Sequence, residues 1–146
     1  LTAAGFEHYE VSNYALPGFR ARHNASYWHG TKYLGIGPAA HSFDGEERHW
    51  NASSVEKYIA GAPAGKEVLT RRDRFNEYVM TALRTVEGID LEEAAARFGA
   101  KRLARMQEEA APFLRSGTLR IARGRMALPP EKFLISDAVI GALFET

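Results

Sequence analysis

The second half of the chain has apolar side chains at helical spacing. Three successive stripes repeat at intervals of three and four residues, which predicts three amphipathic helices. Asp90 is a suitable N-cap for the second helix, with Glu93 three residues later, and Gly99 ends that helix. The stripes are Phe75, Val79, Ala82, Leu83 and Val86; then Leu91, Ala94, Ala95 and Phe98; then Leu103, Met106, Ala110 and Phe113.

Strand-like alternation follows the third helix. Apolar residues alternate over 119–121 and again over 126–128, and Arg123-Gly124 between them provides a turn, which predicts a hairpin. A last helix is predicted over residues 136–144. Three helices followed by a hairpin is the element order of a winged-helix module.

The first sixty residues mix short strands with short helices. The stretch Gly61–Gly65 is the best linker candidate because it is small and rich in helix and strand breakers. We therefore expect an α+β chain with two domains, residues 1–60 and 66–146. Within the first domain the patterns predict a strand over 7–14 ending at Pro17-Gly18, a helix over 21–29, a buried strand over 33–37, a hairpin over 43–50 and a helix over 53–60.

Composition limits the possible chemistry. The 146 residues carry a formal charge of +1, which gives no electrostatic footprint for a polyanion. The chain has no cysteine, so it offers neither a disulfide nor a thiolate ligand for zinc or an iron–sulfur cluster. No apolar run approaches the ~18 residues that span a membrane, and no leader pattern is visible. Because the chain opens at Leu1 in mid-pattern, we expect it to be a fragment.

All five histidines and both tryptophans lie in the first fifty residues. The sharpest cluster is His23, Asn24, Tyr27 and Trp28, whose four-residue spacing pairs His23 with Tyr27 and Asn24 with Trp28 on a helix. His23 is a candidate ligand for a haem iron, with the aromatic rings as apolar walls. The alternative is a histidine that hydrogen-bonds the backbone at a helix N-terminus.

A glycine-rich turn follows this cluster. Gly35 and Gly37 would let a nucleotide or adenosyl group approach the backbone, although any turn at a strand end uses the same residues. His41 follows the turn at the end of a predicted strand, where ligand sites often lie, or it is a core histidine with satisfied hydrogen bonds. The other histidines, His8, His29 and His49, are interpreted as surface residues.

The winged-helix order raises DNA binding as a rival function. Residues 101–116 would enter the major groove, and Lys101, Arg102, Arg105 and Arg115 favour that interpretation. Two glutamates at 108 and 109 oppose it, and a net charge near zero leaves little counterion release. We therefore expect no nucleic-acid partner.

Four segments together resemble one family. They are Tyr9–Ala15, the His23-Asn24-x-x-Tyr27-Trp28 motif, Tyr33–Ser42 and Phe133–Ile140. They resemble radical S-adenosylmethionine proteins related to oxygen-independent coproporphyrinogen III oxidase, in particular the HemW-type haem chaperones. The resemblance covers essentially the whole chain.

This resemblance implies the end of an incomplete (β/α) barrel in residues 1–60, followed by a helical, winged-helix-like domain in residues 66–146. It also implies a [4Fe–4S] cluster and S-adenosylmethionine in the intact parent, although the cysteine motif is absent here. His23, with Asn24, Tyr27 and Trp28, is then the haem-related site and the expected metal ligand. Ile36, Gly37, Pro38 and Ala39 are expected near the adenosyl group, and His41 beyond them is a further cofactor-binding candidate.

We expect the C-terminal part of a cytoplasmic HemW-like chaperone that binds haem or porphyrin and delivers it to an accepting protein. This part alone should be inactive in cluster chemistry, and no cofactor is expected to be fully bound by it. One alternative is a coproporphyrinogen III oxidase, which decarboxylates propionates and forms protoporphyrinogen IX. The other is a non-enzymatic winged-helix binding module.

Overall fold

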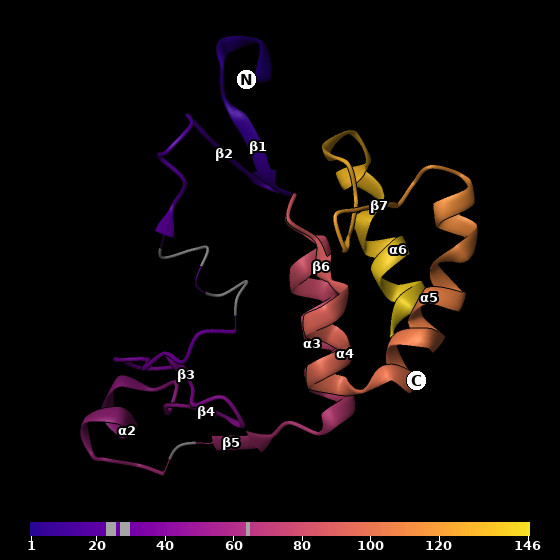
Figure 1. Ribbon diagram of the computed structural model, residues 1–146. Coiled ribbons are helices and arrows are strands. Elements are labelled where there is room, and N and C mark those ends of the chain that lie inside the picture. Colours follow the sequence, from indigo (N-terminus) through magenta and orange to yellow (C-terminus); the bar gives the residue numbers. More distant parts are fainter. Residues whose placement is uncertain (23–25, 27–29, 64) are drawn as a thin grey trace. The chain divides into compact units, whose positions relative to one another are not determined.

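The computed structural model describes residues 1–22, 26, 30–63 and 65–146. The chain divides into two compact units. One combines Leu1–His29 with Arg74–Thr146, and the other consists of Gly30–Asp73. Figure 1 draws both units and labels their elements where there is room.

The N-terminal segment of the first unit contains a 3₁₀ turn, Thr2–Ala4, and an antiparallel hairpin of β1 (Glu7–Glu10) and β2 (Asn13–Ala15). The sequence predicted one strand here, and that prediction was wrong. The chain reverses early because the buried Glu10 carboxylate accepts hydrogen bonds from the Ser12 amide at 2.9 Å and from Asn13 Nδ2. These local bonds favour a tight turn over continued extension.

The helices after residue 70 follow the predicted apolar stripes. They are α3 (Arg71–Leu83), α4 (Leu91–Phe98), α5 (Ala100–Arg115) and α6 (Ser136–Leu143), with a 3₁₀ segment, Pro130–Ile135, before the last. Asp90 caps α4 as predicted, because its side chain accepts a bond from the Glu93 amide at 3.0 Å. Helix α5 continues through Pro112 to Arg115.

A three-stranded sheet completes the helical part. The predicted hairpin is confirmed as β7 (Arg120–Ala122) and β8 (Arg125–Ala127), and a two-residue strand, β6 (Ile89–Asp90), pairs with β8. The order β6-β8-β7 places a strand between the first and second helices in the same sheet as the hairpin. This is the arrangement of a winged-helix module, which the sequence predicted from the helices and hairpin alone.

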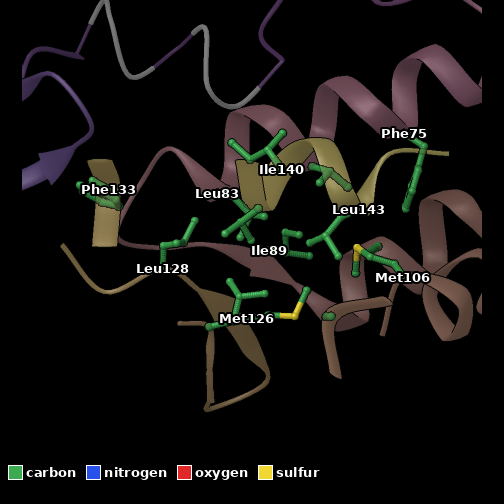
Figure 2. Close-up of a cluster of buried hydrophobic side chains, with 14 residues drawn as sticks. Phe75, Leu83, Ile89, Met106, Met126, Leu128, Phe133, Ile140 and Leu143 are labelled. Carbon is green, nitrogen blue, oxygen red and sulfur yellow. The ribbon is translucent and has the colours of Figure 1, made fainter. Parts of the chain in front are cut away.

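The main core lies in this part of the first unit. Figure 2 shows side chains from the helices meeting those of the small sheet. Val79, Leu83, Ile89, Met126 and Leu143 have no measurable exposure. Burial of this apolar surface is the main stabilising contribution to the module.

The second unit is a small sheet with one short helix. Strands β3 (His41–Phe43), β4 (Glu47–Trp50) and β5 (Gly65–Val68) form an antiparallel sheet in that order, and α2 covers Val55–Ile59. The predicted hairpin and helix are confirmed. Strand β5 begins at Gly65, the last residue of the stretch predicted as a linker.

The predicted buried strand over 33–37 is wrong. Within this stretch only Tyr33 makes a bridge, to Phe43, and the side chains of Leu34 and Ile36 are 79% and 83% exposed. In the part of the chain that the structure describes, no helix has the length and apolar character needed to cross a membrane.

Candidate functional site

The glycine-rich turn of the second unit is held by side chains from three neighbouring segments. The Gly35 amide donates to Ser42 Oγ at 2.9 Å, and the Gly37 amide donates to the Tyr58 hydroxyl at 3.1 Å. Asn51 Nδ2 donates to the carbonyls of Gly35 at 3.2 Å and Gly37 at 2.9 Å. The turn is therefore fixed by β3, by the end of β4 and by α2.

Two backbone features make this turn sensitive to substitution. A Cβ at Gly35 would overlap the His41 backbone, so a larger residue would separate the two segments. Ala39 has a φ of 58°, the left-handed region that costs a non-glycine residue about 1 kcal/mol. Its amide donates to the Ala52 carbonyl at 3.1 Å, which helps to hold that conformation. Strained backbone of this kind often lies where a protein binds something.

Of the predicted adenosyl-site residues, Ile36, Pro38 and Ala39 are exposed and Gly37 is half-buried, and the further cofactor-binding candidate His41 is exposed as well. All belong to one turn and the strand that leaves it. The structure therefore brings them together on a preformed surface. Asn51 and Tyr58 could not be predicted from a local pattern, because they lie 14 and 21 residues along the chain from Gly37, whose backbone they hold.

His41 also lines a pocket of about 330 Å³ in the same unit. Its ring lies 6.0 Å from the indole of Trp50, its cross-strand partner, at an angle of 34°. Trp50 in turn pairs with Gly65 on β5, and its indole lies against that residue where a Cβ would be. Lys57 and Ser53 complete the polar part of the lining.

The haem-site candidates His23, Asn24, Tyr27 and Trp28 fall outside the described residues. The chain just before them is anchored within the first unit. Arg20 donates to Glu7 and to Glu87, and its guanidinium lies 5.2 Å from the centroid of the Tyr9 ring. These hydrogen bonds and the nearby carboxylates raise the pKa of Arg20, although desolvation acts in the opposite direction.

His8 differs from its interpretation as a surface histidine. Its ring stacks on Tyr14 with centroids 4.1 Å apart and meets the edge of Phe133 at 4.9 Å. Its Nε2 lies 3.2 Å from the Val11 carbonyl oxygen. His8 therefore joins the hairpin to the 3₁₀ segment before α6.

Two basic residues of the proposed DNA-reading helix are engaged within the protein. On α5, Arg102 pairs with Glu145, and Arg105 pairs with Glu109 and donates to the Phe144 carbonyl at 2.7 Å. Docking against DNA would compete with these bonds. Among the described residues, no group of three or more histidine and acidic side chains is arranged to hold a metal ion.

Comparison with known proteins identifies the family. A family model described as the HemN C-terminal domain matches residues 69–135, which include α3–α5 and the sheet β6-β8-β7. A relative from Mycobacterium tuberculosis (strain CDC 1551 / Oshkosh), named Heme chaperone HemW, is 38% identical over 149 residues, which cover 98% of this chain. The chain belongs to the HemN/HemW family. A Lactococcus lactis protein, also named Heme chaperone HemW, is 36% identical over 102 residues, covering 67% of this HemN/HemW chain and 27% of that protein.

A solved structure shares the fold of this chain. The Escherichia coli coproporphyrinogen III oxidase HemN, described as a radical SAM enzyme, matches with a TM-score of 0.72 over 99% of this chain and 38% of that one. At 17% identity the likeness concerns the fold alone. The HemN/HemW chain spans about a third of its relatives' length, 36% of the M. tuberculosis protein.

Proposed function

We propose that this chain is the C-terminal part of a HemW-like haem chaperone, a protein that binds haem or porphyrin and passes it to an accepting protein. The observation that carries the proposal is the 38% identity over nearly the whole chain to a protein named Heme chaperone HemW. Relatives of the same name from other bacteria support it. In this proposal residues 1–60 end the barrel and residues 66–146 form the C-terminal domain.

His23 is the proposed haem ligand, with Asn24 beside it and Tyr27 and Trp28 as apolar walls. A neutral imidazole nitrogen is a strong ligand for haem iron. What supports this role is the density of imidazole and aromatic groups in the sequence motif. Arg20, which precedes this motif in the chain, forms ion pairs with Glu7 and Glu87.

The cofactors of the wider family fit this chain unequally. The chain has no cysteine, so its own residues do not fit an iron–sulfur cluster. The turn over Ile36–Ala39 does fit the adenosyl part of S-adenosylmethionine. It offers an exposed apolar side chain at Ile36 and backbone already held by Asn51 and Tyr58. S-adenosylmethionine would supply radical chemistry in the parent, whereas these residues would only bind and orient it.

A haem titration of the intact protein tests the proposal. The Soret band is followed for the wild type, for His23→Ala and for His49→Ala, a control histidine that lies 3.4 Å from Glu47. We expect a saturable Soret shift that His23→Ala weakens and His49→Ala leaves unchanged. Equal binding by all three proteins would remove His23 from the site. No haem binding, together with decarboxylation of coproporphyrinogen, would identify an oxidase instead.

A further inference from the structure

The pocket beside the glycine-rich turn carries polar side chains that make no hydrogen bond or ion pair with the described part of the chain. It lies within the second unit, between the row His41–Trp50–Gly65 across the sheet and the helix α2. Hydrogen bonds account for Asn51, whose side chain holds the turn. The other polar side chains that line the pocket are those of His41, Ser53 and Lys57.

Among the described residues that line the pocket, Lys57 alone carries a full positive charge. Within the described part of the chain, no carboxylate lies within ion-pair distance of its ammonium group, whereas Lys66 lies 3.7 Å from Glu47. The acid next to Lys57, Glu56, accepts a hydrogen bond from Ser54 Oγ at 2.5 Å. That bond lowers the pKa of Glu56, which therefore stays ionised and engaged with Ser54.

Trp50 and Gly65 give the pocket a flat, apolar part of its lining. Trp50 is 37% exposed, and glycine at position 65 lets its indole lie directly on the β5 backbone. An ammonium, a hydroxyl and an imidazole donor near an aromatic face suit a singly charged acceptor attached to an apolar group. A volume of about 330 Å³ is at the small end for ligand pockets, so it suits a side arm and not a whole macrocycle.

We propose that this pocket binds a carboxylate, with Lys57 as its charged partner and Trp50 as its apolar wall. The carboxylate preference stands on the pocket alone, whereas its biological source rests on the proposed function. Two sources share this chemistry: the propionate of a tetrapyrrole and the α-carboxylate at the amino-acid end of S-adenosylmethionine.

The first test uses sodium propionate as a minimal probe. The indole N–H signal of Trp50 is followed by ¹⁵N-correlated NMR on the full chain and assigned with Trp50→Phe, with sodium chloride matching ionic strength. Lys57→Ala is compared with Lys66→Ala. Lys66 follows Gly65 on β5, so its side chain is on the other face of the sheet.

We expect a saturable shift of the Trp50 signal in the wild type and in Lys66→Ala, and in Lys57→Ala a shift that needs about tenfold more propionate to reach the same size. Losing one charge-assisted hydrogen bond at an accessible site corresponds to about tenfold weaker binding. An absent shift in the wild type, or an equal shift in Lys57→Ala, would overturn the proposal.

The second test identifies the source in the intact protein. Binding of mesoporphyrin IX, its dimethyl ester and S-adenosylhomocysteine is measured for the same variants. If the tetrapyrrole is the source, Lys57→Ala weakens binding of the free acid and spares the ester. If the cofactor is the source, only S-adenosylhomocysteine binding falls. If Lys57→Ala changes binding of neither the free-acid porphyrin nor S-adenosylhomocysteine, the proposed site is overturned. If the wild type binds no haem but keeps the propionate shift, only the proposed function is overturned.

Discussion

Gly88 offers the sharpest test of the winged-helix packing. It immediately precedes β6 and has a φ of 66°. A Cβ at this position would overlap the Met126 carbonyl oxygen and would lie 2.7 Å from the Ala127 Cα, both on β8. The obstruction is backbone, so a rotamer change cannot relieve it. Replacing Gly88 with alanine must therefore move β6 away from β8.

The cost can be estimated from three contributions. Alanine in the left-handed region costs about 1 kcal/mol, and restriction of the unfolded chain returns roughly 0.4–1 kcal/mol. Overpacking against β8 adds about 1–3 kcal/mol. Gly124 is the matched control, because its φ is 74° and a Cβ there would meet nothing within 4 Å. We expect Gly88→Ala to destabilise the fold by about 2–3 kcal/mol and Gly124→Ala by less than about 1 kcal/mol.

Thermal unfolding of both variants is followed by circular dichroism at 222 nm. This signal reports on the first unit, because most of the helical residues belong to it. A loss of 2–3 kcal/mol corresponds to a fall in Tm on the order of 5–10 °C for a chain of this size. The control should stay within about 3 °C of the wild type. Equal falls for the two variants would mean that the backbone conformation alone decides the cost, and the close approach of β6 to β8 would be refuted.

Three further results are expected. Burial and the nearby Glu93 raise the pKa of Tyr78 from 10.0 to about 12, so the contribution of Tyr78 to stability is full below pH 10 and is lost as pH rises through about 12. The urea midpoint of the wild type should fall over that pH range, and the midpoint of Tyr78→Phe should fall less. Identical pH profiles for the two proteins would contradict this. Asp90→Ala should cost about 1 kcal/mol because the α4 cap is lost, whereas Asp90→Asn should retain most of it, and equal urea midpoints for the two variants would count against the capping role. Fluorescence anisotropy with duplex DNA should show no salt-dependent binding, because two basic residues of α5, Arg102 and Arg105, already form ion pairs with Glu145 and Glu109. Binding at low salt that weakens as the salt concentration rises would support the DNA interpretation.

The helices could be predicted from the sequence because their signals are local. The apolar stripe through Phe75, Val79 and Leu83 and the cap at Asp90 each lie within a few residues of the helix that they define. The two-residue strand β6 carries no periodicity, and it exists only because Met126 arrives beside Ile89 from a distant part of the chain. Its pairing could not be read from local pattern.

Part of the candidate site could likewise be predicted from local sequence, and part of it could not. The turn over 35–39 could be predicted from its glycines and proline, but its apolar residues suggested a buried strand. The structure exposes Ile36 because the backbone hydrogen bonds of the turn go to side chains of Ser42, Asn51 and Tyr58 instead of to a neighbouring strand. Trp50 and Lys57 lacked a local signal, since the pocket exists only after the sheet and α2 have formed.

The buried carboxylate of Glu10 has a consequence for the order of assembly during synthesis. Its ion-pair partner is Arg84, at 3.5 Å, and the hairpin that carries it bonds to the same later segment through Val11 to Arg84 and Val86 to Tyr9. At translation rates of about 5–20 residues per second, Arg84 is synthesised several seconds after Glu10. Until then the hairpin lacks the ion pair and the backbone hydrogen bonds that join it to Arg84 and Val86. The hairpin of β1 and β2 therefore reaches its final structure only after the segment around Arg84 has been synthesised.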